Sequence, residues 1–453
     1  MSNTAAGPST ATSPSTTNTN AQQHAPATLE ELLHFLLSEQ ENSAVQQTLK
    51  NFVANKNRDS ILASVLASGQ DPLDLLHPET NTLGFLYILS ARLNVPNAPP
   101  PQLAAVEAFC RSFSPTQARL APERVTALAK GIVHASGDNL KFAVAPLRDL
   151  ITRYPPNMSY LTTIHPIFLN ACVSTQNYTS ALPILTSPIL NIDLHLSPDL
   201  HYNDNLIYHY AGGIVFGALK RWTEAEECFE IVVTAPNQVP SALQAEGLKK
   251  LTLVQLILHG KALPPPKFTN SVLIRQFKNS PYFNFAKGYP RTIAKLEPLV
   301  MKDEELFKTE RNWGLIQQVI SRAPRWLIKR LTHIYLTLGL SDIASQIGVR
   351  SEDEVRALVL DMVDTGEIIA SISASGTVTF SDAASQFSYS KEEIDQALAL
   401  AQEQSRLLLQ LEREMNLSKE YIAKALKHKD EAWGAPDEEM YNTHSGGGWG
   451  DDF

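Results

Sequence analysis

Histidine and cysteine are the side chains here that could catalyse a reaction or hold a metal, and their spacing argues against both. The twelve histidines include no His-x-His and no His-Glu-x-x-His pair, the spacings that bring two imidazoles to one zinc ion. His195 and His201 stand near Asp193, Asp199 and Asp204, but this segment contains proline and asparagine and is interpreted as a solvated loop. The sequence therefore predicts no catalytic residue, no metal site and no cofactor.

The three cysteines, Cys110, Cys172 and Cys228, lie far apart and include no Cys-x-x-Cys pair. An odd number argues against a disulfide framework, so we expect reduced, mostly buried thiols in a protein of the cytosol or nucleus. The sequence also lacks the glycine-rich P-loop of nucleotide-binding proteins and the Gly-x-Ser-x-Gly turn of serine hydrolases. These absences favour a non-catalytic protein.

The elements that carry these residues are predicted to be mostly helices. Residues 1–28 are rich in Ser, Thr, Asn, Ala and Pro and are predicted to be disordered, because they cannot bury enough apolar surface. A helical pattern runs from about residue 29 to residue 320, and Thr28 with Glu31 forms a capping box at its start. No apolar run is long enough to span a bilayer, and residues 1–29 lack the arginines of a mitochondrial presequence.

An internal repeat appears when Ala143, Ala181 and Ala225 are aligned. A bulky residue stands three positions before each alanine and another stands four positions after it. This pattern is typical of helix–turn–helix repeats, and the spacing lies between tetratricopeptide and HEAT periods. An ordinary helical bundle with a chance match is the alternative. The flanking residues are Leu140 and Leu147, Tyr178 and Leu185, and Trp222 and Phe229, with Gly131 and Gly213 twelve positions before the first and third alanines.

The segment 323–385 predicts three helices followed by a β-hairpin, which is a winged helix. Leu327, Leu331, Ile334 and Leu338 form one helical stripe, and a second short helix starts at Ser341. The third helix begins with a capping box at Ser351–Glu354 and buries Val355, Leu358, Val359 and Met362, and Gly366 ends it. Ile368, Ala370 and Ile372 alternate as a strand, Ser375 and Gly376 form the turn, and Val378 and Phe380 alternate in the return strand.

A last long helix is predicted within residues 390–428. Ser390 and Glu393 form its capping box, and its apolar face contains Ile394, Leu398, Ala401, Leu408, Leu411 and Met415. Such a face packs against partner helices or folds back on the winged helix of its own chain. The acidic, Gly-rich stretch 429–453 is predicted to be disordered and serves either as a docking motif or as a solubilising tail.

The distribution of charged residues favours binding to proteins over binding to nucleic acids. Residues 351–367 carry six acidic side chains and only Arg356 as a base, so DNA phosphates would repel the third helix of the wing. We therefore expect protein contacts through a free strand edge at 368–372 or 377–380. Residues 245–335 hold sixteen bases against six acids, whereas 336–453 hold nine against 22. The Lys and Arg residues of 245–335 are dispersed along the segment, which favours a solvated helix face. The functional alternative is that they bind an acidic protein partner.

Two stretches of the winged helix resemble the PCI domain, which is shared by the proteasome lid, the COP9 signalosome and translation initiation factor three. They are Leu331–Ser345, read as Leu-Thr-His-Ile-Tyr-Leu-Thr-Leu-Gly-Leu-Ser-Asp-Ile-Ala-Ser, and Met362–Ile372. Tyr208–Lys261 is similar as well. The resemblance is strongest to PCI subunits of the signalosome, covers residues 200–385 well, and is interpreted as that of a fungal member.

The resemblance implies a mostly α fold: a helical-repeat solenoid, a winged-helix (PCI) subdomain and a C-terminal bundle helix. It divides the chain into repeats at 29–199, a PCI domain at 200–385 (helical part 200–322, winged helix 323–385) and C-terminal helices at 390–428. It implies a scaffold in the cytoplasm and nucleus whose partners are other PCI subunits and, indirectly, cullin-RING ligases, from which the complex removes a ubiquitin-like modifier. Membrane and nucleic acid are not expected partners; another PCI assembly (proteasome lid, translation initiation factor three or a nucleic-acid-binding mRNA-export complex) is the alternative. The expected protein-contact residues are Ile368, Ile369, Ala370, Ser371, Ile372, Val378, Phe380, Ile394, Leu398, Leu408, Leu411 and Met415.

Overall fold

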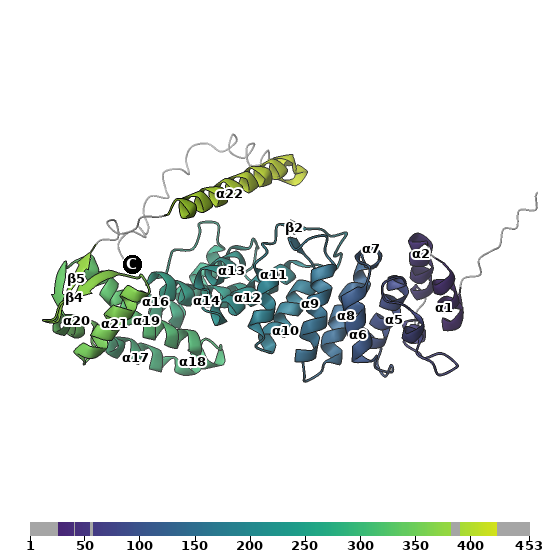
Figure 1. Cartoon of the computed structure of the whole chain (residues 1–453), viewed down its shortest axis with the longest axis horizontal. Coiled ribbons are helices and arrows are strands. Elements are labelled where there is room, and N and C mark those ends of the chain that lie inside the picture. The colour runs from purple at the N-terminus through teal and green to yellow at the C-terminus, as the bar shows by residue number, and fades with distance from the viewer. Residues whose placement is uncertain (1–25, 40, 55–57, 382–389, 424–453) are drawn as a thin grey trace, which may run out of the picture. The chain divides into compact units, whose positions relative to one another are not determined.

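The computed structural model describes residues 26–39, 41–54, 58–381 and 390–423 (Figure 1). The expected disorder at 1–28 and 429–453 lies outside these residues, except for 26–28. The chain forms two compact units. Unit 1 holds the described residues of 1–254 and 264–277, and unit 2 holds 255–263 and the described residues from 278 onwards.

Unit 1 consists of helices apart from one short parallel strand pair, β1 (Tyr160–Leu161) with β2 (Asn191–Ile192). The helices lie side by side in chain order in Figure 1. They are α1 (Leu29–Ser38), α2 (Asn42–Val53), α3 (Arg58–Leu62), α4 (Pro72–Leu75), α5 (Thr82–Asn94), α6 (Leu103–Ser112), α7 (Pro115–Ala118), α8 (Pro122–Ala135), α9 (Lys141–Arg153), α10 (Ile164–Ser174), α11 (Tyr178–Leu185), α12 (Tyr202–Ala218) and α13 (Trp222–Thr234); α14 (Ala242–His259) and α15 (Ser271–Lys278) contribute residues to both units.

The three aligned alanines occupy equivalent places in three successive helix pairs. Ala143, Ala181 and Ala225 lie near the start of α9, α11 and α13, and none has any exposed surface. Small residues let the paired helices approach closely: a Cβ at Gly213 of α12 would lie 2.7 Å from the ring of Phe229 in α13. The helical repeat predicted from these residues is confirmed.

The turns inside two of these pairs share one backbone conformation, and a third copy occurs in unit 2. Gln176, Lys220 and Arg311 adopt left-handed φ values of 57°, 59° and 56°, which is uncommon for residues other than glycine. In each turn the next backbone N–H reaches back five residues to a helix carbonyl at 2.9 Å, which makes a Schellman cap. The three hydrogen bonds join Asn177 to Cys172, Arg221 to Phe216 and Asn312 to Phe307. The sequence alignment missed the third pair because no alanine marks it.

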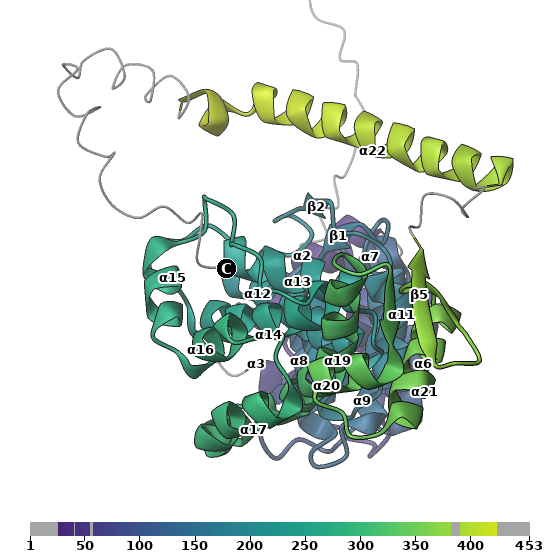
Figure 2. The same cartoon turned by 90° about the vertical axis from the view of Figure 1, so that its left-hand side faces the viewer.

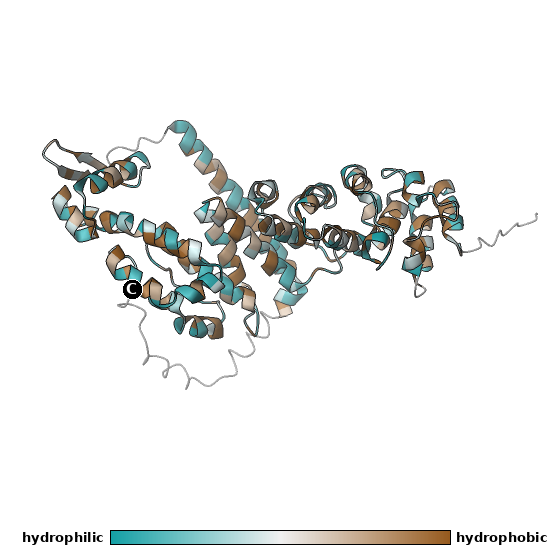
Figure 3. Ribbon diagram, turned by 90° about the horizontal axis from the view of Figure 1, so that it is seen from below, coloured by the Kyte–Doolittle hydropathy of each residue, from teal (hydrophilic) through white to brown (hydrophobic). Residues whose placement is uncertain are grey.

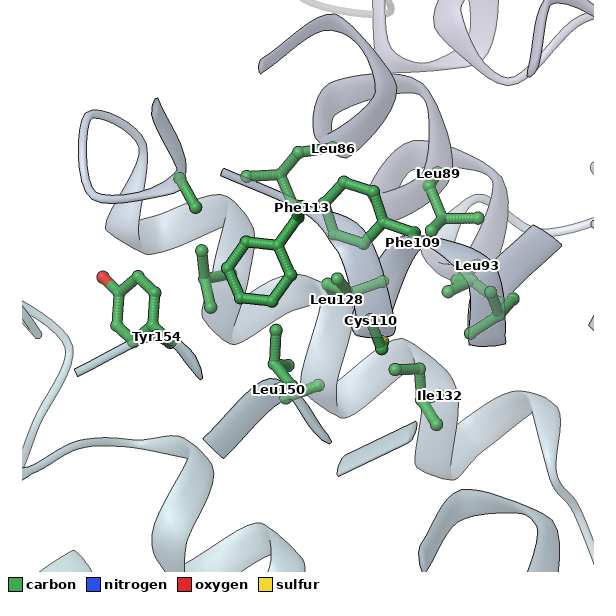
Figure 4. Close-up of a cluster of buried hydrophobic side chains, with 14 of the residues drawn as sticks. Leu86, Leu89, Leu93, Phe109, Cys110, Phe113, Leu128, Ile132, Leu150 and Tyr154 are labelled. Carbon is green, nitrogen blue, oxygen red and sulfur yellow. The ribbon is translucent and has the colours of Figure 1, made fainter. Parts of the chain in front are cut away.

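In the core of unit 1, Leu86, Leu89 and Leu93 of α5 cluster with side chains of α6, α8 and α9 (Figure 4). Every residue of α5 from Thr82 to Leu93 is buried. The ring of Phe85 in α5 stacks in series with those of Phe109 and Phe113, with centroids 5.2 and 5.5 Å apart. Cys110 lies in this cluster and has no exposed surface.

Unit 2 contains the winged helix. Its three-stranded antiparallel sheet has the order β3-β5-β4, and the helices α19, α20 and α21 pack together with it (Figures 1 and 2). Its elements are α16 (Pro281–Lys287), α17 (Ile293–Lys302), α18 (Glu304–Thr309), α19 (Trp313–Thr332), β3 (Thr337–Gly339), α20 (Leu340–Ile347), α21 (Glu352–Asp364), β4 (Ile369–Ile372), β5 (Thr377–Ser381) and α22 (Lys391–Leu417).

Three details of the predicted winged helix are wrong. The helical stripe stops early, because α19 ends at Thr332; Ile334 is 68% exposed and Leu338 lies in β3. Strand β3 was not predicted, because its three residues pair with β5 only in the folded sheet. Ser351 does precede α21, but its side chain makes no capping hydrogen bond.

The other local signals are confirmed. Thr28 and Glu31 form the predicted capping box, as do Ser390 and Glu393. Gly366 adopts φ +71° after α21, and the N–H of Glu367 bonds the carbonyl of Met362 at 2.8 Å, as a Schellman cap requires. Val355, Val359 and Met362 are fully buried, and Leu358 packs partly against the same core.

Candidate protein-interaction site

Strand β4 lies at the edge of the wing sheet, and β5 does not. β5 pairs with β3 on one side and β4 on the other, so residues 377–380 cannot accept a further strand. That half of the predicted strand edge is wrong, because the unpredicted strand β3 covers it. Among the described residues, the side of β4 opposite β5 has no neighbouring strand.

The hydrogen-bond pattern shows which β4 backbone groups face outward. At the turn, the N–H of Ser373 donates to the carbonyl of Thr377 at 2.9 Å. Hydrogen-bonded pairs alternate along an antiparallel ladder, so Ser371 and Ile369 also direct their N–H and C=O toward β5. Ala370 and Ile372 therefore direct theirs to the free edge, where an added strand would bond them.

The side chains of the predicted edge residues fall into two groups. Val378, Phe380 and Ile368 are 0%, 4% and 7% exposed, so they form the core of the wing and offer no contact surface. Ala370 and Ile372 pack partly against the same core. Ile369 and Ser371 alternate with them and lie on the opposite face of the sheet.

The loop between α19 and β3 adds apolar surface that the sequence reasoning missed. Ile334, Tyr335 and Leu336 are 68%, 38% and 78% exposed. Leu336 and Ile369 line a pocket of about 190 Å³ at the end of the sheet where β4 begins, and Lys329 and His333 border it. The signal was present as three consecutive apolar residues, but the helical stripe assigned Ile334 to a buried face.

Ion pairs link the basic and acidic stretches within unit 2. Arg325 contacts Asp361 and lies 3.0 Å from Glu367, and Arg322 also pairs with Glu367 at 3.0 Å. These pairs neutralise part of the acidic charge of α21. Glu352, Asp353 and Glu354 remain in the first turn of α21, where their charges suit the positive end of the helix dipole.

Those three acids bear on the expectation that the wing does not bind DNA. The N-terminal residues of a recognition helix contact the bases in helix–turn–helix readers. In α21 this end is the most acidic part of the wing, so phosphates would repel it. The ion pairs neutralise charge near the end of α21, but phosphates would still be repelled by the acidic side chains of its first turn.

Helix α22 presents the other predicted contact residues. Ile394, Leu398, Leu408, Leu411 and Met415 are between 37% and 67% exposed, and no described residue of α22 is buried. Hydrophobic residues, brown in Figure 3, recur along this helix. The five side chains share one side of the helix, and no other described part of the chain buries them.

Two carboxylates near residue 200 accept hydrogen bonds from local backbone. The N–H of His195 donates to Asp193 at 2.8 Å, and the N–H of His201 donates to Asp204 at 2.8 Å. Within the part of the chain that the structure describes, no group of three or more His, Cys, Asp or Glu side chains could hold a metal ion.

The cysteines and the buried histidine are poorly suited to chemistry. Cys110 and Cys172 are buried and Cys228 is half-buried. Burial raises the pKa of Cys172 and of Cys228 to about 12, and burial also raises the pKa of Cys110, so the thiols stay protonated. Burial lowers the pKa of His165 to about 3, and its Nδ1 accepts the N–H of Thr162 at 3.1 Å.

None of the described helices combines the length and apolar composition that a membrane crossing needs.

Two family models match the chain. The first is described as COP9 signalosome complex subunit 3, N-terminal helical repeats, and matches residues 43–273, about half of the chain. The second, the PCI domain, matches residues 294–382 and contains the whole wing sheet.

Two curated relatives carry one name. The COP9 signalosome complex subunit 3 of Dictyostelium discoideum is 34% identical over 289 residues, which are 62% of this chain and 68% of that protein. The COP9 signalosome complex subunit 3 of Arabidopsis thaliana is 31% identical over 365 residues, which are 78% of this chain and 83% of that protein.

Proposed function

This chain belongs to the COP9 signalosome subunit 3 family, and on that premise we propose that it is a non-catalytic scaffold that holds neighbouring subunits through its winged helix and α22. The uncovered edge of β4 carries this proposal. Ala370 and Ile372 direct two N–H and two C=O groups outward from a sheet whose core is fully packed. A strand or loop of a neighbouring subunit can bond these groups without unfolding the wing.

Helix α22 supplies the second contact. Its apolar side chains are exposed in the isolated chain, and association with partner helices would remove that surface from water. In this proposal a neighbouring subunit pairs with the edge of β4 on the winged helix, and α22 joins a bundle with helices of other subunits.

The catalytic step is assigned to a partner. The thiols of this chain stay protonated, and its described residues offer no metal site. The complex would remove a ubiquitin-like modifier from cullin-RING ligases in the cytoplasm and nucleus, with this chain in contact with other PCI subunits and not with the cullin.

The other PCI assemblies are not favoured. Both relatives and the repeat model name the signalosome, and none of these names refers to the proteasome lid or translation initiation factor three. The mRNA-export alternative needs a basic face, whereas Arg322 and Arg325 are engaged with acids of the wing. The boundary at residue 200, the other domain boundaries and a fungal origin stay predictions.

The test is incorporation of edited chains into the complex in cells. Deleting residues 391–428 is expected to remove the chain from the purified complex, as measured by the stoichiometry of co-purified subunits by mass. Unchanged stoichiometry would contradict the role of α22. The purified chain alone is expected to show no isopeptidase activity on a modified cullin.

Strand addition is tested separately with a proline. The Ala370→Pro variant loses an outward N–H but keeps the hydrogen bonds to β5, so the wing is expected to stay folded. Incorporation into the complex is expected to fall about ten-fold, because one hydrogen bond to the added strand is lost and the proline ring blocks the edge. Ser371→Ala is the matched control, because its backbone groups face β5. Equal incorporation of both variants would exclude pairing at β4.

A further inference from the structure

The apolar face of α22 contains one amide in its middle. Gln404 is the central residue of the helix, thirteen positions from Lys391 and thirteen from Leu417. Residues three, four and seven positions away are its neighbours on the helix surface. All six of these are apolar: Ala397, Leu400, Ala401, Leu407, Leu408 and Leu411.

The width of this face indicates more than one partner helix. With 3.6 residues per turn, the apolar side chains from Leu407 to Ala401 on the helical wheel cover about 120° around Gln404, and Glu412 and Ser405 lie beyond Ala401. The seam of a two-stranded coiled coil is narrower. A stripe of this width is typical of a helix that packs against several others.

Once this face is covered, the amide of Gln404 leaves water. It is exposed in the isolated chain, as are Leu400, Leu408 and Leu411 on either side of it. A buried amide without a hydrogen-bond partner is costly, so native interfaces pair it. None of the six surrounding side chains can donate or accept a hydrogen bond, so the partner must come from outside α22.

We propose that Gln404 sets the register of α22 in the bundle by pairing with an amide or hydroxyl side chain on a helix of another subunit. A single polar residue in an apolar seam fixes register and partner at some cost in stability. A slip by one turn would put Gln404 against an apolar side chain and leave two polar groups unpaired. This inference rests on the proposed bundle and adds the chemistry of the facing residue.

The alternative occupant is a second copy of this chain. Because Gln404 is the midpoint of α22, two antiparallel copies would bring the two Gln404 amides together. One copy covers only a narrow seam of the face, and the family name describes a complex of several subunits, so we favour helices of other subunits.

The matched control variant is Gln410→Leu. Gln410 is also exposed on α22, but its neighbours include Arg406, Arg413 and Glu414, and its Nε2 donates to Glu414 at 3.0 Å. It therefore lies on the charged side, where the same substitution leaves the apolar face unaltered.

The experiment is a competition in cells that express equal amounts of tagged wild-type and variant full chain. The complex is purified through another subunit, and the ratio of the two chains is measured by mass. Gln404→Leu is expected to be disfavoured about 5- to 150-fold, the effect of one unpaired buried polar group, with Gln404→Asn intermediate and Gln410→Leu equal to wild type. Equal or preferred incorporation of Gln404→Leu would overturn the proposal.

Light scattering on the full chain alone separates the two occupants. The wild-type chain is expected to be monomeric, whereas a wild-type dimer that Gln404→Leu alters would assign Gln404 to self-pairing and overturn the proposal. The deletion of 391–428 distinguishes failure of the bundle proposal from failure of the register inference. If the deletion abolishes incorporation but Gln404→Leu has no effect, the bundle stands and the register inference fails; if the deletion has no effect, the bundle itself fails.

Discussion

Helices α5 and α22 are both rich in leucine, yet the chain treats them in opposite ways. Twelve of the thirteen residues of α5 are buried, whereas α22 has 27 residues and none is buried. Helix α5 is buried on all sides because α2, α3, α6, α7 and α8 surround it. Helix α22 is apolar on one side and charged on the other, and no other described residue buries its apolar side, which the proposed function assigns to helices of other chains.

Because of this difference, substitutions around α5 and substitutions on α22 should affect different properties, chain stability and assembly. Changes around α5 should lower the stability of the isolated chain and affect assembly only through folding. Changes on the apolar face of α22 should leave the isolated chain stable and act on assembly alone.

The largest effect is expected from Phe109→Ala beside α5. Its ring has no exposed surface and stacks between Phe85 and Phe113, so its removal leaves a cavity. We expect a loss of about 3–5 kcal/mol in the free energy of unfolding, measured with urea. A loss below about 1 kcal/mol would mean that the core of unit 1 is not continuous around α5.

Acid should weaken unit 1 through His165. Burial lowers the folded-state pKa of His165 to about 3, so below the unfolded-state pKa of about 6.5 only the unfolded chain takes up the proton. Stability therefore falls as the pH falls through this window, by about 2 kcal/mol between pH 7 and pH 5. The His165→Asn variant keeps an acceptor for the N–H of Thr162 but has no imidazole to protonate. Its unfolding free energy, measured with urea at both pH values, should therefore fall by about 2 kcal/mol less than that of the wild type.

Gly213→Ala tests the close contact of a helix pair. The added Cβ would lie 2.7 Å from the ring of Phe229, which has no room to move because it is buried. We expect a loss of about 1–3 kcal/mol in the free energy of unfolding. Gly217→Ala on the same helix meets its nearest neighbour at 3.8 Å and is the control, with little or no loss.

The smallest effect on folding is expected from Leu408→Ala in α22. This side chain is 67% exposed, so the unfolding free energy of the isolated chain should change by less than about 0.5 kcal/mol. Incorporation into the complex should nevertheless fall in the competition described for Gln404. Destabilisation of the isolated chain as large as that of Phe109→Ala would show that α22 packs against its own chain, and the contrast with α5 would be lost.

Much of the fold was predictable from local patterns. Thr28, Ser390 and Gly366 signal helix ends through bonds that span three to five residues, and each acts as expected. The alanines at 143, 181 and 225 mark helix pairs because a small buried side chain lets the two helices of a pair approach closely. Such signals depend on nearby residues, so one sequence is enough to read them.

The candidate site was predictable only in part. The amphipathic character of α22 was identified from helical periodicity, but Leu400 and Leu407 of its apolar face were not named. The wing edge was half wrong, because the pairing of Leu338 with Val378 depends on strands some forty residues apart. An apolar residue at 338 fits a helical stripe as well as a strand, and only the completed sheet chooses between them.

The sequence by itself determined the helical repeats, the winged helix, the lack of recognisable catalytic motifs and the amphipathic last helix. Each follows from spacing, capping or composition within a short window. The tertiary structure alone decided that β5 is covered and β4 is open, that Val378 and Phe380 belong to the core, and that Arg322 and Arg325 neutralise part of the wing. Strand pairing and ion pairing join residues far apart in the chain, so their outcome depends on the packing of the whole unit.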